Sequence, residues 1–358
     1  MTEGGSFMTR EILIIRLSSI GDVIHCTPVA GSLKAAWPDC RITWLVGETC
    51  ADLIKDNPHI DEIMVWPRER FDKHLRAYEF SQAYDMWRDL QQQLSGKSFY
   101  AVLDIHGLFL TGMIARQVRT DRRIGLKCAR ELNPLFMTEQ AAPLGTHIID
   151  RYLGVLTALG IRPACREMLL MVPGEAKEFA QHFLQQENVS LEDRVAVLVP
   201  GTTWPTKNWP AERFAATAAR LAKDFKILLC GGKSELNLGR EIVAKAGVPV
   251  INAIGQTSLL EMAAILGCAA VVIAGDTGPL YMAAALGTPT VAIFGPTNPA
   301  TYVPPGKNNT FVYNQQACSF CHKTKCRLKS MDCISSVQPA AVVEQVYRVG
   351  KNHESAKE

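Results

Sequence analysis

The loop of residues 17–25 (LSSIGDVIH) carries the side chain best suited to remove a proton. An apolar strand is predicted over residues 12–17, and a helix is predicted from about Asp22 to residue 37. A carboxylate at a helix N-terminus is stabilised as the anion. Asp22 is therefore expected to be ionised and to act as a general base toward a hydroxyl nucleophile. The alternative is that Asp22 only caps the helix. Gly21 permits a tight turn or a close backbone approach.

A second loop, residues 200–210 (PGTTWPTKNWP), carries groups that bind phosphate. Thr202 and Thr203 offer hydroxyls and backbone N–H groups, and Lys207 adds a mobile positive charge. Together they could hold a diphosphate without a metal ion. The pattern GxxxxGK[ST] of the P-loop is absent. The alternative is a turn whose threonines bond to their own backbone.

The loop of residues 230–236 (CGGKSEL) contains an acidic residue after a predicted strand. Glu235 could accept hydrogen bonds from ribose hydroxyls, which is a common task of an acidic residue in nucleotide-binding folds. The alternative is a solvated glutamate in the first helical turn, with Ser234 as the N-cap.

The loop that opens residues 274–289 (AGDTGPLYMAAALGTP) precedes another predicted helix. Thr277 and Gly278 would present hydroxyl and N–H groups at the positive end of that helix, which is an anion site. Asp276 would repel phosphate, so we expect it to cap and orient the loop. The alternative is a capped helix that binds nothing.

Two segments of the first half are rich in basic residues. Residues 116–130 (RQVRTDRRIGLKCAR) form one cluster, and residues 68–76 form a weaker one. Each is either a solvated charged face or a basic patch for an acidic acceptor.

Four of the eleven cysteines lie close together near the end of the chain. Their spacing is Cys318-x2-Cys321-x4-Cys326-x6-Cys333. Zinc sites use similar spacings, but two CxxC pairs are not present. The cluster is a weak metal candidate, and the alternatives are a disulfide staple or reduced thiols packed in a loop. The other seven cysteines are expected to be reduced.

The order of predicted elements indicates a parallel α/β fold with two domains. The chain has 358 residues, and apolar strands alternate with helices along both halves. Strands are predicted at residues 41–46, 63–65, 100–104, 194–199, 226–230, 250–252, 270–273 and 290–294, with a short one after residue 165. Helices are predicted at residues 50–56, 80–95, 146–160, 210–223, 234–246, 258–266, 279–286 and 338–349. In such sheets ligands bind beyond the carboxyl ends of the strands.

Composition excludes several classes of protein. Hydrophobic residues make up 47% of the chain, which argues against disorder. A net charge of +3 is too even for a general nucleic-acid binder. No stretch approaches the roughly 20 apolar residues of a membrane span. Residues 1–10 are expected to be a loose leader and not a signal peptide.

The loops taken together resemble glycosyltransferase family 9, the heptosyltransferases that build the inner core of lipopolysaccharide. The resemblance rests on the motifs ILIIRLSSIGDVIHCTPV, PGTTWPTKNWP, CGGKSEL, GDTGPLYMAAALGTPTVAIFGPTNP and CSFCHKTKCRLKSMDC. It covers residues 12–335, and the last motif is most similar to that of the second heptosyltransferase type.

The resemblance implies a GT-B fold of two Rossmann-like domains facing a central cleft. Residues 1–175 would bind the acceptor, residues 176–335 would bind the ADP-sugar, and residues 336–358 would form a helix and tail. The reaction would be inverting and would use no cofactor or divalent metal. The resemblance places the catalytic groups at Asp22 and Lys207. The implied donor-binding residues are Thr202, Thr203, Lys207, Glu235, Asp276, Thr277 and Gly278, and the acceptor-binding candidates are Ser19, Gly21, His106, Arg116, Arg119 and Lys127.

The implied partners are an ADP-sugar and a lipid-linked, acidic saccharide. The enzyme would be cytoplasmic and peripheral on the inner face of the inner membrane, with no nucleic-acid partner. One position departs from the family pattern, because Tyr281 stands where many members have His. The alternatives are a transferase or epimerase acting on another nucleotide sugar, or a non-catalytic protein that binds a nucleotide sugar.

Overall fold

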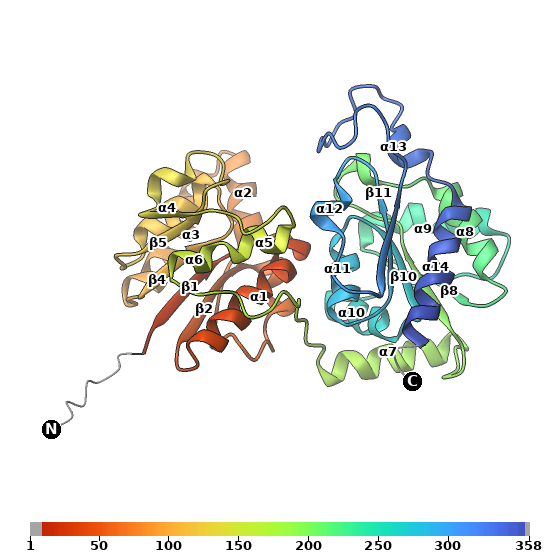
Figure 1. Ribbon diagram of the computed structural model, residues 1–358, viewed down its shortest axis with the longest axis horizontal. Helices are drawn as coiled ribbons and strands as arrows, with labels where there is room; N and C mark the ends of the chain where they lie inside the picture. Colours follow the sequence, from red (N-terminus) through yellow and green to blue (C-terminus); the bar gives the residue numbers. More distant parts are fainter. Residues whose placement is uncertain (1–8, 355–358) are drawn as a thin grey trace. The chain divides into compact units, whose positions relative to one another are not determined.

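The structure is a computed structural model that describes residues 9–354. The predicted leader therefore lies mostly outside the described residues, as does the end of the predicted tail. The chain divides into two compact units, residues 1–169 and residues 170–358 (Figure 1).

A six-stranded parallel sheet forms the centre of the first unit. Its spatial order is β3-β2-β1-β4-β5-β6. This is the classic order of a Rossmann fold. The central strands are apolar and buried on both faces, as expected for a parallel sheet covered by helices. The strands are β1 (Glu11–Ile15), β2 (Arg41–Gly47), β3 (Glu62–Trp66), β4 (Ala101–Asp104), β5 (Arg123–Leu126) and β6 (Glu139–Ala141).

Helices cover both faces of this sheet (Figure 1). α2 (Arg68–Arg76), α3 (Phe80–Ser95) and α4 (Phe109–Gln117) bury apolar side chains in one cluster with alternate residues of β1 and β3. α1 (Ile20–Ala36) packs against α5 (Ile148–Leu153). The remaining elements are η1 (Glu48–Leu53), η2 (Asn133–Phe136) and α6 (Val155–Ala158).

The second unit repeats the same topology. Its parallel sheet has the order β12-β11-β10-β7-β8-β9, which is again the classic order when numbered from β7. The strands are β7 (Val195–Val199), β8 (Lys226–Leu229), β9 (Ile251–Asn252), β10 (Val271–Gly275), β11 (Thr290–Phe294) and β12 (Asn309–Tyr313).

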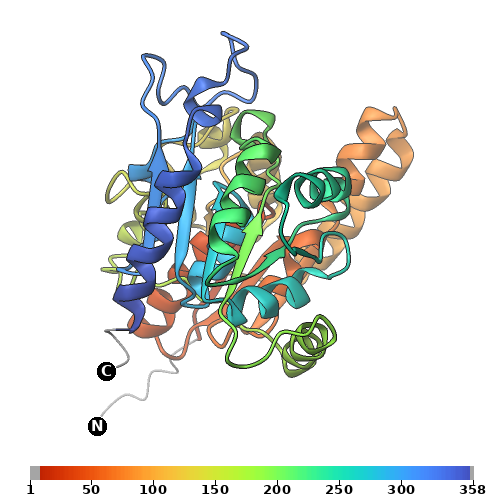
Figure 2. The same ribbon diagram turned by 90° about the vertical axis from the view of Figure 1, so that its right-hand side faces the viewer.

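One face of this second sheet is covered by α8 (Ala211–Leu221), α9 (Leu236–Ala246) and α14 (Pro339–Glu354). Figure 2 shows α14 lying along the sheet, so the predicted last helix is part of this unit. α7 (Gly174–Gln186), α10 (Leu259–Cys268) and α11 (Gly278–Ala285) pack together elsewhere in the unit. The short elements are η3 (Pro205–Lys207), η4 (Lys233–Glu235), α12 (Pro299–Tyr302) and α13 (Asp332–Ser335).

Several sequence expectations are corrected by the structure. The helix predicted at residues 50–56 is the 3₁₀ turn η1, and the helix predicted at residues 146–160 is split into α5 and α6. The short strand predicted directly after residue 165 is not formed. Instead, residues 161–172 run without regular structure, and Leu169 N–H donates to Thr27 Oγ1 at 2.9 Å. The elements that were not predicted include α2, α4, β5, β6 and β12.

A glycine at the end of β2 allows close packing beside the loop after β1. Gly47 N–H donates to the Leu17 carbonyl at 2.8 Å. A Cβ built on Gly47 would lie 2.5 Å from that carbonyl oxygen. The obstacle is space and not backbone conformation, because φ of Gly47 is −73°. Gly47 therefore helps to position the loop that carries Asp22.

We predict that Gly47→Ala destabilises the protein by about 1–3 kcal/mol, the usual cost of overpacking. Thermal or denaturant unfolding measures this. Gly174→Ala is the matched control, because a Cβ there meets nothing within 4 Å. Equal stability of the two variants would contradict the steric role of Gly47.

Candidate active site

Each sheet has a switch point, at which the order of the strands reverses and the chain continues on the other side of the first strand. In the first unit it lies between β1 and β4, and in the second between β7 and β10. Loops that leave the carboxyl ends of these strands diverge and leave a crevice in which ligands bind. Asp22 and His106 follow β1 and β4, whereas Lys207 and Thr277 follow β7 and β10. The loops that carry these four residues therefore lie at the switch point of their own unit.

Asp22 lies inside the first turn of α1 and accepts contacts on both carboxylate oxygens. The N-cap position of α1 is Ser19, so the alternative that Asp22 caps the helix is wrong. Arg16 forms an ion pair with Oδ2 at 2.5 Å, and Ser19 Oγ donates to the same oxygen at 3.0 Å. Tyr152 donates its hydroxyl to Oδ1 at 2.6 Å. These three contacts fix the carboxylate, and its side chain stays 30% exposed.

The surroundings of Asp22 keep it ionised. Burial by itself would raise the pKa of Asp22, but the Arg16 charge and the Tyr152 hydrogen bond outweigh burial and lower it to about 2. A carboxylate offers about four acceptor positions, and three partners are present. The group therefore remains able to accept a hydrogen bond from an incoming hydroxyl.

Arg16 is the residue that positions Asp22, and the sequence analysis missed it. Arg16 is 7% exposed, and its Nη1 donates to the Ile105 carbonyl at 3.0 Å. The guanidinium also lies over the Tyr152 ring, 5.1 Å from the ring centre. The available signal was an arginine that interrupts the apolar run ILIIRL.

His106 lies at the same edge of the first sheet as Asp22, and its imidazole ring is neutral. Arg68 Nη1 contacts His106 Nε2 at 2.8 Å and donates to Ser18 Oγ at 3.0 Å. Because arginine only donates, Nε2 accepts and the ring proton sits on Nδ1. Burial and the charges of Arg16 and Arg68 lower the pKa of His106 to about 2. Arg68, from the weaker basic cluster, thus belongs to this site.

The loop after β4 is held by a buried aspartate. Asp104 Oδ1 accepts from the backbone N–H groups of His106 at 3.1 Å and Gly107 at 3.0 Å. Its other oxygen accepts from Asn133 Nδ2 at 2.7 Å. Burial raises the pKa of Asp104. This arrangement fixes the backbone that carries His106.

The other acceptor candidates divide between two edges of the sheet. Gly21 is buried in the first turn of α1, so of the two roles considered for it the tight turn is not formed. Lys127 is exposed directly after β5, at the same edge as Asp22. Arg116 ends α4, and Arg119 bridges to Ser98, just before β4 begins. The structure places Arg116 and Arg119 at the opposite edge, away from Asp22.

The switch point of the second unit carries a cation paired with a buried carboxylate. Lys207 Nζ lies 2.8 Å from Asp276 Oδ2 and 4.3 Å from the centre of the Trp204 ring. The expectation of a mobile Lys207 is therefore wrong. Thr277, and not Asp276, is the N-cap residue of α11. Tyr281 is buried and donates its hydroxyl to Asp276 Oδ1 at 2.5 Å.

Two donor-site candidates bond within their own loops. Thr202 Oγ1 is 2.8 Å from the Trp204 carbonyl and 2.6 Å from Asn208 Oδ1. The alternative of a self-satisfied turn therefore holds for Thr202, whereas Thr203 is exposed.

Glu235 is likewise engaged by its own loop. Its Oε2 accepts from Gly232 N–H at 2.6 Å, and Oε1 accepts from the Ser234 hydroxyl. Gly232 occupies the N-cap position of η4, so the expectation that Ser234 caps this segment is wrong. Gly201 packs so closely that a Cβ there would lie 2.3 Å from Glu235 Cγ. Glu235 thus links the loops after β7 and β8.

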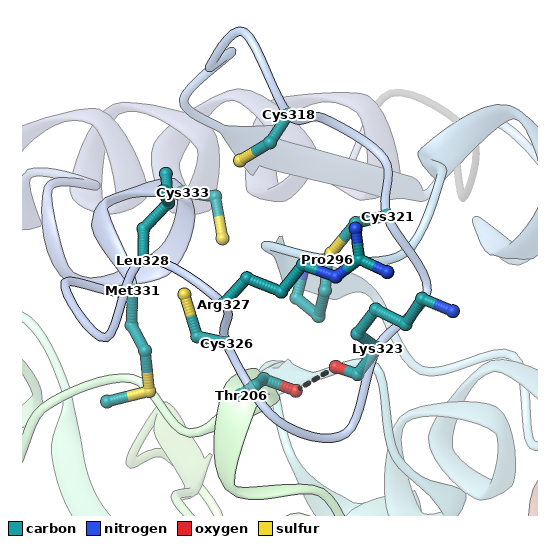
Figure 3. Close-up of a pocket in the computed structure, with 10 residues that line it drawn as sticks. All are labelled: Thr206, Pro296, Cys318, Cys321, Lys323, Cys326, Arg327, Leu328, Met331 and Cys333. Carbon is teal, nitrogen blue, oxygen red and sulfur yellow. Dashed lines mark hydrogen bonds between the residues drawn. The ribbon is translucent and has the colours of Figure 1, made fainter.

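The four clustered cysteines surround a cavity of about 180 Å³ in the second unit (Figure 3). All of them are free thiols, so the disulfide alternative is wrong. Within residues 9–354, no three His, Cys, Asp or Glu side chains are placed so that they hold a metal ion as they stand. In the same range, no helix is long and apolar enough to cross a membrane.

Comparison with known proteins gives one consistent result. The family model for glycosyltransferase family 9 (heptosyltransferase) matches residues 87–332. The lipopolysaccharide core heptosyltransferase OpsX of Haemophilus influenzae is 24% identical over 270 residues, which cover 74% of this chain and 73% of the relative.

Solved structures show the same fold. A family 9 glycosyl transferase from Veillonella parvula superposes with a TM-score of 0.83 at 23% identity, covering 96% of this chain and 98% of that one. The E. coli heptosyltransferase WaaC with ADP gives a TM-score of 0.73 at 23% identity, covering 95% and 99%. The two Rossmann-like units are those of a GT-B fold.

We predict that Tyr152→Phe raises the pKa of Asp22 from about 2 toward its ordinary 3.8, because one hydrogen bond to the carboxylate is lost. The ring that contacts Arg16 is retained. A folded-state pKa below the unfolded value stabilises the fold above pH 3.8, and this stability is lost as the pH falls through 2. The variant is therefore expected to unfold at a higher pH in acid.

A carbon-13 NMR titration of the Asp22 carboxyl measures the shift. Tyr281→Phe, which removes a hydroxyl–carboxylate bond at Asp276, is expected to leave the pKa of Asp22 unchanged. An unaltered Asp22 titration in Tyr152→Phe would refute the assigned cause.

Proposed function

Because the chain belongs to glycosyltransferase family 9, the heptosyltransferases, we propose that it transfers heptose from ADP-heptose to the inner core of lipopolysaccharide. The observation that carries the proposal is the pair of switch points. One holds a partly exposed carboxylate, and the other holds a lysine beside a helix N-terminus. The names of the relatives, and the ADP bound to WaaC, support the choice of donor.

Asp22 is the general base of the proposed reaction. The acceptor hydroxyl hydrogen-bonds to the carboxylate and attacks the anomeric carbon from the face opposite the ADP, so the reaction is inverting. With a pKa near 2, Asp22 is a weak base in the resting enzyme. It gains the proton only as the new C–O bond forms and the hydroxyl becomes acidic.

The leaving diphosphate is stabilised in the second unit. Negative charge grows on its oxygens as the sugar–phosphate bond breaks. Lys207 supplies a positive charge, and the N–H groups at the start of α11 supply a positive helix end. Thr203, which is exposed in the preceding loop, adds a hydroxyl donor. These groups perform the task that a divalent metal performs in other transferases, so we propose a metal-independent reaction.

The acceptor is a lipid-linked, acidic saccharide in this proposal. Ser19, Gly21 and His106 line the edge that carries Asp22, and Arg68 and Lys127 supply positive charge there. Residues 1–169 would therefore bind the acceptor and residues 170–358 the ADP-sugar. A lipid-linked acceptor places the enzyme at the cytoplasmic face of the inner membrane, as a peripheral protein. The cysteine tail favours the second heptosyltransferase type.

Asp22→Asn is expected to lower the transfer rate by about 10²–10⁴-fold while ADP binding is retained, because the amide cannot accept the proton. Product analysis with ADP-heptose and lipopolysaccharide acceptor measures transfer. Asp61→Asn is the matched control, since Asp61 is equally exposed (31% against 30%) and pairs with Lys34 at 2.8 Å. A folded Asp22→Asn enzyme with normal transfer would disprove the base assignment.

Lys207→Ala is expected to weaken ADP binding about 10–100-fold and AMP binding much less, because the lysine contacts the diphosphate. Calorimetric titration measures both affinities, and the native enzyme is expected to prefer ADP to UDP and GDP. Removing Lys207 leaves Asp276 buried without its cation, so the double variant Lys207→Met with Asp276→Asn tests the same loss without that charge. Lys245→Ala, which breaks a surface pair with Glu241, is the control. Unchanged discrimination between ADP and AMP in the double variant would contradict the role of Lys207.

A further inference from the structure

α2 and α3 form a helical hairpin that stands out from the rest of the first unit (orange in Figure 2). An aromatic cluster fixes its base, where Trp66 of β3, Phe71 of α2 and Trp87 of α3 pack with ring centres 5.0, 6.4 and 6.5 Å apart. Beyond this cluster every residue from Leu75 to Gln82 is exposed. These residues, 75–82, are the hairpin tip. The hairpin therefore has a rigid base and an end that meets solvent.

Large apolar side chains gather at the hairpin tip instead of in the core. Tyr78 is 80% exposed, Phe80 61% and Tyr84, one turn further along α3, 63%, and Leu75 ends α2 beside them. The rings of Tyr78 and Phe80 meet edge to face with centres 6.1 Å apart. Phe80 and Tyr84 are four residues apart on α3 and share one face of it. A single exposed apolar side chain is ordinary, but a group of them marks a surface that contacts another body.

The backbone at Tyr78 gives a second reason to assign this surface a partner. Tyr78 has φ of 60°, in the left-handed region, where a residue with a bulky side chain costs free energy and glycine or asparagine does not. The exposed ring recovers none of that cost by burial within the chain. Folding alone therefore favours a smaller residue at this turn, whereas a partner that covers the ring favours tyrosine.

Two unpaired cations flank the apolar group. Lys73 and Arg76 are exposed in the last turn of α2, and neither forms an ion pair with any carboxylate among residues 9–354. The carboxylates nearby have partners of their own, which are Asp72 with Arg68 at 3.5 Å, Glu79 with His74 at 2.5 Å, Asp85 with Arg88 at 3.0 Å and Glu69 with the Thr49 hydroxyl at 3.1 Å. The end of the hairpin thus combines aromatic rings with positive charge that the protein itself does not neutralise.

We propose that the hairpin tip, with Tyr84 and the two unpaired cations, docks on an anionic phospholipid bilayer. Tyr78, Phe80 and Tyr84 enter the interface, where the apolar body of an aromatic ring is buried and a tyrosine hydroxyl stays hydrated. Lys73 and Arg76 lie against the lipid phosphates. A second copy of this chain fits less well, because a symmetric contact through this surface brings the same cations together from both sides.

α2 connects this surface to the edge that carries Asp22. The helix begins at Arg68, which contacts Ser18 and His106 at that edge. Arg76 lies eight residues further along, a rise of about 12 Å. A bilayer at the hairpin tip therefore lies close enough for a saccharide to reach Asp22 while its lipid stays in the membrane. This link rests on the proposed function, in which the acceptor is lipid-linked, but the docking itself takes no part in the chemistry.

Sedimentation of the full-length protein with lipid vesicles tests the docking. Vesicles of phosphatidylethanolamine and phosphatidylglycerol are expected to bind the protein, and Phe80→Ser is expected to weaken this binding about 5–20-fold, because an apolar ring no longer enters the interface. Leu191→Ser is the matched control, since Leu191 is a fully exposed apolar residue of the second unit, and its binding is expected to equal that of the native protein.

The charge is tested separately from the rings. The double variant Lys73→Gln with Arg76→Gln is expected to bind the anionic vesicles about 25-fold more weakly, roughly fivefold for each cation. Its residual binding to neutral phosphatidylcholine vesicles is expected to match that of the native protein. Lys177→Gln with Lys223→Gln removes two exposed lysines of the second unit and is the control.

Tyr78→Asn keeps the proposal testable if another variant misfolds, because asparagine tolerates the left-handed backbone at this turn. This variant is expected to bind anionic vesicles more weakly while its melting temperature stays equal or rises. Native-like vesicle binding by both Tyr78→Asn and Phe80→Ser would overturn the proposal. A concentration-dependent dimer that Phe80→Ser abolishes would overturn it as well, because a second copy would then cover the surface.

Transfer assays separate this inference from the proposed function. In the Phe80 and Tyr78 variants, transfer to a delipidated core saccharide is expected to be unchanged, whereas transfer to acceptor embedded in vesicles falls with vesicle binding. An equal loss with both acceptors would contradict the docking role. If vesicle binding follows the expectations above and the native protein transfers no heptose, the proposed function fails and the docking surface stands.

Discussion

The ion pair between Arg16 and Asp22 is the interaction on which the chemistry proposed for the first unit depends. A guanidinium buried at the end of an apolar strand is costly unless a carboxylate and a carbonyl satisfy it. Asp22 and Ile105 supply these partners. The same pair keeps Asp22 deprotonated. Loss of the carboxylate would leave a buried charge unpaired, which costs about 3–5 kcal/mol. Stability and the proposed proton transfer are therefore linked at one contact.

The two units use the same topology but present opposite charges. Each switch point holds an ion pair, Arg16 with Asp22 and Lys207 with Asp276. In the first unit the carboxylate side chain is 30% exposed and the cation 9%, whereas in the second the carboxylate is 6% exposed and the cation 13%. In the proposed reaction, the first edge offers an anion for a hydroxyl proton, and the second offers a cation for phosphate. This asymmetry is what a transfer between a hydroxyl acceptor and a diphosphate donor requires.

The strands and the site differ in how far sequence could predict them. Buried strands of a parallel sheet are continuous apolar runs, so β1, β7 and β11 were readable. β5 (RIGL) is only four residues long and is interrupted by a glycine, and β6 (EQA) is short and mostly polar, so neither has such a run. Helix α4 was missed because its glycine and threonine weaken the helical pattern.

Within the candidate site, local sequence pointed to the groups proposed to meet substrate better than to the groups that hold them. Asp22 was found because it stands in a strand-to-helix loop. Tyr152, which donates to it, lies 130 positions away on α5, and no spacing rule connects the two. Lys207 was found but was expected to be mobile, because its partner Asp276 comes from another strand.

Tyr281 shows why the departure from the family's histidine has a local effect. The tyrosine hydroxyl is buried and donates to Asp276, which in turn pairs with Lys207. A tyrosine hydroxyl donates this hydrogen bond as a neutral group, whereas a histidine would add a side chain that becomes charged near neutrality. Tyr281 therefore fixes the carboxylate that fixes the lysine. In the proposed donor site, the positive charge comes from Lys207 and the start of α11 and does not depend on a charged side chain at position 281.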